Sequence, residues 1–215
     1  MSRVYCVSDL HGELGLFKQI QEYLKEGDIC YVLGDCLDRG ECGIEIIFEI
    51  MKDSRFIMLL GNHEKMFLEI VSDYKQGYTG ELYRYFLSGG RPTWDSYLQL
   101  SEKDAETLVY FLHSLPLRIE YKDKIMTHAG FHDGVSIECE ETYLWDRSHL
   151  DISSPMRDKW IIHGHTPTRL IQEECFGILH YHEKKICVDC GATFLKRTGI
   201  LDLDSLEQIY FEEPK

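Results

Sequence analysis

The chain has 215 residues, a length that favours one large domain over several small ones. Hydrophobic residues make up 44% of it and charged residues 28%, and this globular composition excludes both a disordered and a fibrous chain. The net charge of -14 disfavours nucleic acid and anionic lipid as partners and favours a metal ion or a basic group. Because the sequence has neither an apolar run of about 18 residues nor a signal-peptide core at its start, we expect a cytoplasmic protein without a membrane span.

The N-terminal part of the sequence alternates short apolar strands with amphipathic helices. Strands are predicted over Val4–Ser8, Ile29–Gly34 and Phe56–Leu60. Helices are predicted over Leu14–Glu26 and Gly43–Lys52, where apolar residues recur along one stripe. This alternation is typical of β-α-β units and indicates an α/β sheet.

The middle of the chain has a helical pattern from Glu64 to His113, which predicts a helical insert over about residues 66–115. Ser101 and Asp104 have the spacing of a capping box, and they would begin the last helix of this insert. No linker or internal repeat separates the insert from the rest of the chain.

Strands return after Pro116, mostly without long helices between them. They are predicted over Leu117–Tyr121, Lys124–His128, Trp160–His163, Lys185–Asp189, Gly199–Leu203 and Gln208–Phe211. Because helices and strands segregate along the chain, we expect an α/β (α+β) fold in a single domain, residues 1–215. Two sheets would pack together as a β sandwich, with the helices outside.

Eight cysteines are scattered along the chain, and without a secretory signal we expect them to be reduced thiols. Cys187 and Cys190 alone have a C-x-x-C spacing. A structural zinc site would need a second such pair, and a redox motif would open a helix. This pair closes a strand instead, so we interpret it as two thiols at a strand end.

Polar clusters rich in Asp, Asn and His follow five of the predicted strands. The clusters are Asp9–Gly12, Gly34–Gly40, Gly61–Glu64, His128–Gly130 and His163–Thr166. Because the ligands of an open α/β sheet gather beyond the carboxyl ends of its strands, we expect these clusters to form one site. Asp9 and His11, as alternate residues of an extended segment, would point the same way and could reach one ion.

The residue types indicate what this site holds. Each cluster alone has a simpler explanation, since D-x-H can be an ordinary turn and a buried histidine is usually a hydrogen-bonded core residue. Together, carboxylate and amide oxygens mixed with imidazoles suit Mn, Fe or Zn ions. There are more ligands than one ion can take, so we expect two divalent ions with an aspartate between them.

The series D-L-H-G, G-D-x-x-D-R-G, G-N-H-E, H-A-G and G-H-T resembles the motifs of the calcineurin-like metallophosphoesterases. The match runs from Asp9 to Thr166. The D-R-G sequence at Asp38–Gly40 resembles the phosphoprotein phosphatase branch, in particular its compact bacterial and phage members. Pro167 stands where the wider superfamily often has a second histidine, which also favours this branch. The resemblance implies a metallophosphoesterase-like two-sheet β sandwich flanked by helices.

The resemblance implies a role for each matching residue. One metal would be held by Asp9, His11 and Asp35, and the other by Asp35, Asn62, His128 and His165. Asp35 would therefore bridge the two ions. His63 and Asp38 would form an acid pair, with His63 near the leaving-group oxygen and Asp38 orienting it.

Three residues would contact the phosphoryl group according to the same resemblance. They are Arg39, Asn62 and, by a looser analogy, Arg147 in Leu144-Trp-Asp-Arg147. His163 precedes a predicted ligand by two residues, and we expect it to support the site or to have a structural role.

Residue chemistry and resemblance both indicate metal-dependent hydrolysis of phosphate monoesters. Two divalent ions, with Mn²⁺ favoured over Fe or Zn, would ionise a bridging water to the hydroxide that attacks phosphorus. The favoured substrate is a phosphorylated protein, which makes the chain a serine/threonine protein phosphatase, and a small phosphoester is the other partner considered.

Two rival functions are considered. The first is a bis(5′-nucleosyl)-tetraphosphatase, or another phosphodiesterase or nucleotide phosphatase, in which the insert would recognise the base. The second is an inactive module that binds phosphopeptides. An inactive module would have eroded ligand positions, whereas all six positions are intact.

Overall fold

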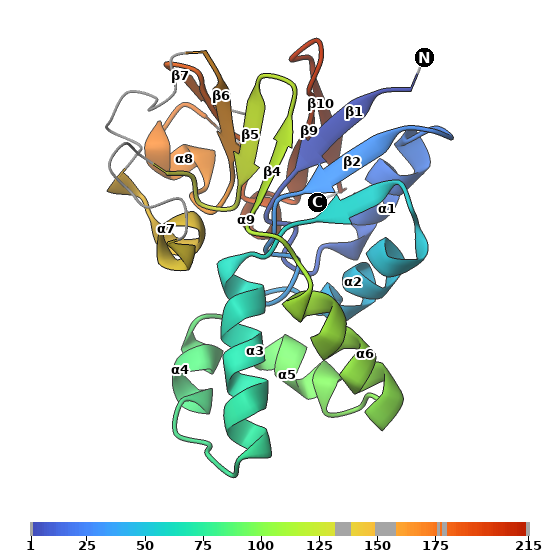
Figure 1. The fold of residues 1–215 in the computed structure, drawn as a ribbon, viewed down its shortest axis with the longest axis vertical. Coiled ribbons are helices and arrows are strands. Elements are labelled where there is room, and N and C mark those ends of the chain that lie inside the picture. The colour runs from blue at the N-terminus through green and yellow to red at the C-terminus, as the bar shows by residue number, and fades with distance from the viewer. Residues whose placement is uncertain (1, 132–138, 149–157, 176, 178–179, 214–215) are drawn as a thin grey trace.

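The computed structural model describes residues 2–131, 139–148, 158–175, 177 and 180–213, and Figure 1 shows its fold. In these residues the strands form two sheets, with the orders β10-β9-β1-β2-β3 and β4-β5-β6-β8-β7. Helices flank both sheets. The predicted mixed α/β fold with two sheets is confirmed.

The first sheet is built around three parallel strands. These are β1 (Val4–Val7), β2 (Ile29–Val32) and β3 (Phe56–Met58), and Val4 is paired with Ile29 and Cys30 with Phe56. The antiparallel strands β9 (Arg197–Asp202) and β10 (Gln208–Glu212) extend the sheet on the other side of β1. The carboxyl ends of β1, β2 and β3 therefore meet at one edge.

The second sheet also contains three parallel strands. Its parallel strands are β5 (Lys124–Thr127), β6 (Trp160–His163) and β8 (Lys185–Cys187). The antiparallel strands β4 (Arg118–Tyr121) and β7 (His180–His182) lie at its two edges.

Apolar side chains fill the space where the two sheets face each other. Cys6, Leu33 and Leu59 from the first sheet pack in one buried cluster with Met126 and Ile162 from the second. Each of these side chains is fully buried. Burial of such a layer fixes the position of one sheet against the other, and with it the distance between loops that follow strands of different sheets.

Two long helices cover the first sheet and four more form the insert. The helices α1 (Leu14–Tyr23) and α2 (Gly43–Lys52) lie beside β1 to β3 in Figure 1. The insert gathers below the sheets in the same view and contains α3 (Asn62–Lys75), α4 (Leu82–Leu87), α5 (Arg91–Tyr97) and α6 (Glu102–His113). Ser101 Oγ accepts a hydrogen bond from Asp104 N at 3.1 Å, as the predicted capping residue of α6 should.

Some element boundaries differ from the sequence prediction. Helix α1 ends at Tyr23 rather than Glu26, because Asp28 Oδ2 accepts the Lys25 N–H at 2.9 Å and closes a turn there. Four short elements were not predicted: β7, α7 (Glu140–Trp145), α8 (Thr168–Ile171) and α9 (Ala192–Leu195). All eight cysteines are free thiols, as expected.

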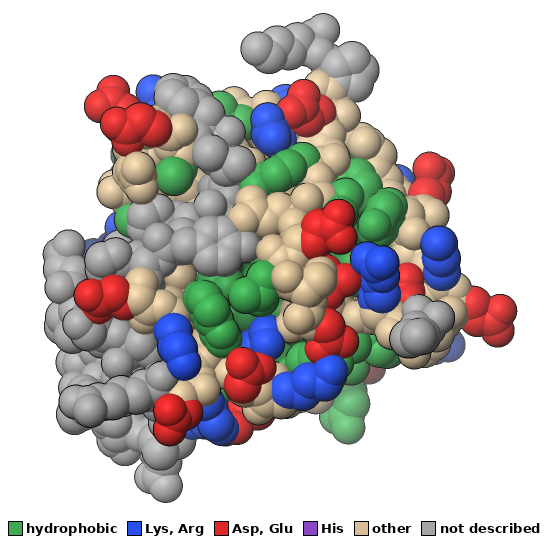
Figure 2. Space-filling view, turned by 90° about the horizontal axis from the view of Figure 1, so that it is seen from above, with side chains coloured by type: hydrophobic (Ala, Val, Ile, Leu, Met, Phe, Trp, Pro, Cys, Tyr) green, Lys and Arg blue, Asp and Glu red, His purple; other side chains and the backbone are tan. Residues whose placement is uncertain are grey.

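Within the described ranges, none of the helices combines the length and apolar character that a membrane span requires. Figure 2 shows the molecule from above, at the end away from the helical insert. Acidic and basic side chains are interspersed on the described part of this face, so the negative net charge is not gathered there into one patch.

Candidate metal centre

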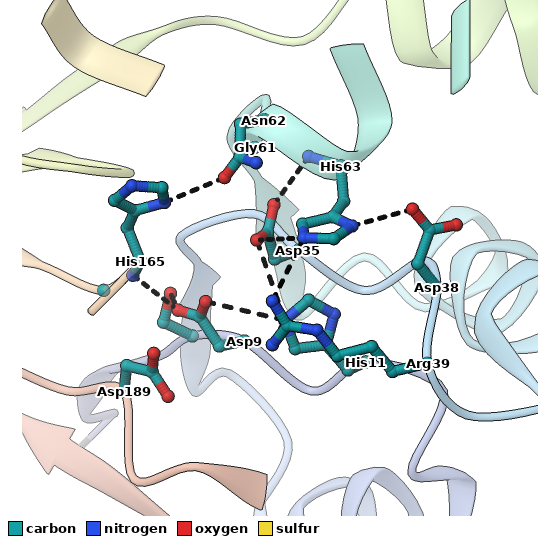
Figure 3. Close-up of polar contacts among 12 residues, drawn as sticks. Asp9, His11, Asp35, Asp38, Arg39, Gly61, Asn62, His63, His165 and Asp189 are labelled. Atoms are coloured by element: carbon teal, nitrogen blue, oxygen red, sulfur yellow. Dashed lines mark hydrogen bonds and ion pairs between the residues drawn. The ribbon is translucent and has the colours of Figure 1, made fainter. Parts of the chain in front are cut away.

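The five predicted polar clusters converge on one site, where the loops of both sheets meet. Figure 3 labels residues from four of them, and His128 of the fifth lies within 3.4 Å of Asp35 and 2.8 Å of Asn62. From the first sheet, Asp9 and His11 follow β1, Asp35 to Arg39 follow β2, and Asn62 and His63 open α3. From the second sheet, His128 follows β5 and His165 follows β6. The six predicted metal ligands are all at least nine-tenths buried, with relative exposures of 8% or less.

The loops achieve this convergence with left-handed backbone. Positive φ angles occur at Asp9 (55°), His11 (42°), Asp35 (56°), Asp38 (68°), Arg39 (67°) and His165 (66°). The expectation that Asp9 and His11 lie on an extended segment is therefore wrong, since β1 ends at Val7. Such conformations are unfavourable for residues with a side chain, and they persist where the surrounding structure enforces them.

Backbone contacts enforce these loop conformations. His11 N donates to Asp35 O at 2.9 Å, and Asp9 N donates to Gly34 O at 3.1 Å, so the β1 and β2 loops are tied together. Gly164 joins the second sheet to them, because a Cβ at this position would overlap Ser8 Oγ and Asp9 Oδ2. The close approach of the two sheets at the site thus depends on a glycine.

Asp35 lies at the centre of the cluster. Two groups of possible ligands share its carboxylate, His11 with His63 and His128 with His165, and in each group the ligand atoms lie within 4.8 Å of one another. Asp35 Oδ2 is 3.7 Å from His11 Nε2, and Asp35 Oδ1 is 3.4 Å from His128 Nε2. One carboxylate therefore faces two clusters of nitrogen ligands with its two oxygens.

The group around Asn62 has the donor set of a cation site. Asn62 Oδ1 is 2.8 Å from both His128 Nε2 and His165 Nδ1. His128 Nδ1 donates to Leu33 O at 2.8 Å, which turns Nε2 toward the amide and carboxylate oxygens. In these contacts a proton stands between each nitrogen and the amide oxygen, and a cation could take its place, since this mixed oxygen and nitrogen set fits a divalent transition metal.

The group around His11 is oriented in a similar way. His11 Nδ1 donates to Leu37 O at 2.8 Å, so Nε2 faces the centre. Nε2 lies 3.8 Å from Asp9 Oδ1, while Asp9 Oδ2 already accepts hydrogen bonds from Ser8 Oγ and His165 N. Of the two carboxylate oxygens of Asp9, Oδ1 is therefore the one that could bind an ion beside His11, since these hydrogen bonds engage Oδ2.

Burial and the Asp35 carboxylate shift the pKa values of the histidines around the centre in opposite directions. Burial lowers the pKa of His11 to about 3 and that of His165 to about 3. Burial would also lower the pKa of His128, but the Asp35 carboxylate outweighs it and raises the pKa to about 10. Burial would raise the pKa of Asp35, but the neighbouring His128 and His63 hold it well below its usual range. The carboxylate thus attracts a proton or a cation to the position of His128 Nε2.

The two residues of the predicted acid pair are hydrogen-bonded to each other at the side of the centre. His63 Nδ1 donates to Asp38 Oδ2 at 2.7 Å, and His63 Nε2 lies 3.8 Å from Asp35 Oδ2. Burial would lower the pKa of His63, but the carboxylates of Asp35 and Asp38 raise it. The imidazole is therefore held with Nδ1 on one carboxylate and with Nε2 toward the predicted metal ligands, as Figure 3 shows.

Arg39 contacts this centre, and Arg147 lines the groove beside it. Arg39 Nη1 lies 2.7 Å from His11 Nε2, and Nη2 lies 3.2 Å from His63 Nε2. Arg147 is exposed and lines the same groove as Arg39, and its charge contributes to the lowered pKa of His165. Both guanidinium groups thus place positive charge at this end of the groove.

A groove of about 850 Å³ opens from the centre toward the insert. It is lined by Arg39, Asn62, His63, Met66, Glu69, Ile70, Asp73, Glu81, Arg84, Tyr85, Leu87, Ser88, Trp145, Arg147, His165 and Phe194. The far part lies over α3 and α4. The predicted substrate-contacting residues Arg39, Asn62 and Arg147 all lie along this one groove.

Sequence reasoning did not assign a role to Glu64, although it belongs to the third motif. Its Oε1 accepts hydrogen bonds from Cys36 N and Leu37 N at 2.8 and 3.0 Å, and its Oε2 accepts from Asp35 N and Gly61 N at 2.7 and 3.1 Å. One fully buried carboxylate therefore joins two ligand loops, and burial raises its pKa to about 7. Its position three residues into the capping box of α3 was the available signal.

Two other buried side chains near the centre were not predicted. Tyr85 comes from α4, and its hydroxyl donates to Asp38 Oδ1 at 2.5 Å. Asp189, after β8, lies beside Asp9 in Figure 3, and its Oδ2 has no hydrogen-bond partner among the residues that the structure describes. Burial raises the pKa of Asp189 well above its usual range, with Asp9 adding to the effect.

His163, Cys187 and Cys190 lie at or just after the ends of β6 and β8, next to the loop that carries His165. His163 is buried at the end of β6, and its Nδ1 lies 3.1 Å from Gly164 O. The Cys187 Sγ donates to Thr166 O at 3.2 Å, which connects β8 to the loop of His165. Burial raises the pKa of both thiols, so they are neutral packing groups at a strand end.

Comparison with known proteins identifies the family and the fold. A family model described as calcineurin-like phosphoesterase matches residues 2–201, whereas a search among curated proteins gives no match.

A solved protein provisionally assigned as a diadenosine tetraphosphatase has a TM-score of 0.69 at 17% identity, over 98% of this chain and 93% of that one. A cold-active protein-tyrosine phosphatase from a psychrophilic Shewanella has a TM-score of 0.63 at 18% identity, over 98% and 77%.

A third similar structure is a protein serine/threonine phosphatase from Saccharomyces cerevisiae, with a TM-score of 0.60 at 14% identity, over 100% of this chain and 81% of that one. At these identities the three likenesses establish a shared fold. Because the names of these three proteins refer to different substrates, the substrate of this chain has to be inferred from its own residues.

Proposed function

This chain belongs to the family of calcineurin-like phosphoesterases, which are metal-dependent phosphoester hydrolases, and we propose that it is a serine/threonine protein phosphatase acting on phosphate monoesters. Two divalent ions, Mn²⁺ by preference, would occupy the centre. When bound, they would supply an activated water and neutralise charge on the phosphoryl group.

The ligand geometry supports two ion positions. One would be held by Asp9, His11 and Asp35, and the other by Asp35, Asn62, His128 and His165. The support is that Asp35 faces both clusters of nitrogen ligands, and that hydrogen bonds to backbone carbonyls turn the free nitrogens of His11 and His128 inward. In this proposal Asp35 bridges the ions.

His63 is the proposed proton donor to the leaving group. His63 forms a possible metal-binding group with His11 and Asp35, in which the predicted third ligand was Asp9. However, its Nδ1 is engaged by Asp38, which is the arrangement of an imidazole held to transfer a proton at Nε2. Arg39, Asn62 and Arg147 would contact the phosphoryl oxygens, which guanidinium groups bind bidentately.

The distribution of charge along the groove is the main reason to propose a phosphate monoester, rather than a dinucleoside tetraphosphate, as the substrate. Cationic groups stand at the metal end, whereas Glu69, Asp73 and Glu81 line the far end. Arg84, the cation of that end, is paired with Glu81 at 3.2 Å. The further phosphates of a dinucleoside tetraphosphate would therefore meet carboxylates, while a single phosphoryl group would be held entirely at the cationic end.

The apolar part of the groove is compatible with a peptide. Leu87, Trp145 and Phe194 are 71%, 43% and 70% exposed, and all three line it. Exposed apolar side chains beside a charged centre provide surface for the residues that flank a phosphorylated side chain.

A substrate panel tests this function. The metal-reconstituted protein should have a higher kcat/KM for phosphoserine and phosphothreonine peptides than for diadenosine tetraphosphate or a 2′,3′-cyclic nucleotide. Asp73→Asn should reduce this difference, because it removes one carboxylate from the far end of the groove. If the dinucleotide is hydrolysed at least about tenfold more efficiently than every monoester, the chain is a dinucleoside tetraphosphatase instead.

A further inference from the structure

The phenol of Tyr85 extends the acid pair into the helical insert. Its hydroxyl donates to Asp38 Oδ1 at 2.5 Å, while Asp38 Oδ2 accepts from His63 Nδ1 at 2.7 Å. Both Tyr85 and Asp38 are buried, with relative exposures of 3% and 0%. One carboxylate thus has each oxygen engaged by a different donor, one from α4 and one from the start of α3.

The insert holds both Tyr85 and Asp38 in place. The tyrosine ring lies directly against Gly90, where a Cβ would overlap it. Asp38 N donates to Thr93 Oγ1 at 2.9 Å, so α5 contacts the same residue from its backbone side. Two consecutive helices of the insert therefore fix Asp38, which itself has left-handed backbone with a φ of 68°.

We propose that Tyr85 is a positioning residue for proton transfer by His63, and that this is a task of the helical insert in the reaction. The hydroxyl fixes the rotation of the Asp38 carboxylate, so that Oδ2 stays aimed at His63 Nδ1. The imidazole then keeps Nε2 toward Asp35 and the predicted phosphoryl position. The proposal rests on the proposed function, because it requires that His63 donate a proton to the leaving group.

The surroundings of Tyr85 suit this task. Burial raises the pKa of its phenol, and Asp38 adds to the effect, so the hydroxyl keeps its proton and acts as a donor. A short hydrogen bond from a neutral donor to a buried carboxylate is stronger and more directional than one between neutral groups. Without it, one oxygen of a fully buried carboxylate would lose this donor, and the carboxylate could rotate away from His63.

The substitution Tyr85→Phe tests the role, since it removes the hydroxyl and keeps the ring. With a phosphoserine peptide, whose leaving group is a poor one, kcat should fall about tenfold, a part of the roughly 10²–10⁴-fold that general acid catalysis supplies. With p-nitrophenyl phosphate, whose leaving group needs little protonation, kcat should change by less than about twofold. KM for both substrates and the bound metal should remain as in the unmodified protein.

Tyr97→Phe is the matched control. Tyr97 is a buried tyrosine of α5 in the same insert, and its ring packs against Phe67 and Trp94. This variant should leave kcat unchanged for both substrates. Equal losses on the two substrates in Tyr85→Phe, or no loss on the peptide, would overturn the proposal, because neither would depend on the leaving group.

A double-mutant cycle separates this proposal from the function on which it rests. In a His63→Asn background, Tyr85→Phe should cause no further loss on the peptide, because its effect passes through the imidazole. An additive loss would overturn the role of Tyr85. If His63→Asn alone lowers kcat equally for the peptide and for p-nitrophenyl phosphate, the proton-donor role of His63 is wrong. The proposal for Tyr85 is then wrong as well.

Discussion

At the scale of single residues, the centre depends on side chains that hold loops as much as on those that face the proposed metal positions. The carboxylate of Glu64 accepts four backbone N–H groups, from Asp35, Cys36, Leu37 and Gly61. These donors belong to the two loops that carry Asp35 and Asn62. Glu64 therefore sets the distance between the central carboxylate and the amide of the Asn62 group.

We expect Glu64→Gln to weaken both folding and metal binding. An amide can accept hydrogen bonds with one end only, so two buried N–H donors would face an NH₂ group and lose their partner. Each lost partner costs about 1–3 kcal/mol, so urea denaturation of the metal-free protein should show a fall of about 2–6 kcal/mol in the free energy of unfolding. Glu69→Gln on the same helix, where the side chain is 63% exposed, should change that free energy by less than about 0.5 kcal/mol. A variant of Glu64 as stable as the unmodified protein would contradict this account.

The sequence was sufficient to predict which side chains gather at the site, but not how they reach it. The six predicted ligands come together because each follows a strand of a parallel group, a rule that the pattern of apolar residues already contains. The left-handed backbone at Asp9 and His11 depends on hydrogen bonds to the β2 loop, which lies about 25 residues further along the chain. The contact between Tyr85 and Asp38 likewise joins residues 47 positions apart, and no local pattern predicts it.

At the scale of elements, the ends of α1, α2 and β3 are joined by one ion pair. Arg55, just before β3, donates from Nη2 to Asp53 Oδ2 at 2.6 Å and from Nη1 to Leu24 O at 2.6 Å. Asp53 is the C-cap of α2 and Leu24 that of α1. The hydrogen bonds from Arg55 lower the pKa of Asp53 to about 2.

This pair should give a pH-dependent contribution to stability. The pKa of Asp53 is lower in the folded chain than the ordinary value of about 3.9, so its stabilisation is complete above about pH 4 and is lost as the pH falls through 2. Asp53→Asn should lower the free energy of unfolding by about 1–2 kcal/mol at pH 7. Urea denaturation should show this difference shrinking between pH 4 and pH 2. A difference that stays constant over this range would contradict the proposed ion pair.

The long periodic elements were predictable, and the short ones were not. Helix α2 has the predicted bounds, because its apolar residues keep a helical period over all ten of its positions. Strand β7 and helices α8 and α9 have three or four residues each, which is too short for any period to be detected. These elements depend on tertiary contacts, such as the antiparallel pairing of β7 with β8.

At the scale of the whole molecule, the candidate centre joins the two sheets. Asp9, His11, Asp35 and Asn62 belong to the loops of the first sheet, whereas His128 and His165 belong to those of the second. A metal held by Asp35, Asn62 and the two histidines would therefore bind across the interface. We expect residues 1–215 to behave as one domain that gains stability when metal binds, since an ion that binds only the folded chain shifts the folding equilibrium.

The central claim is that Asp35 bridges two divalent ions, and metal stoichiometry tests it most directly. The protein should be stripped with a chelator, reconstituted with Mn²⁺ and freed of excess metal, and its metal content should be measured by elemental analysis beside its activity. We predict about two ions per chain for the unmodified protein and about one for Asp9→Asn, while Asp35→Asn should retain close to none because its carboxylate serves both positions. Full activity with one ion or none per chain, or an Asp35→Asn variant that keeps both ions, would contradict the account.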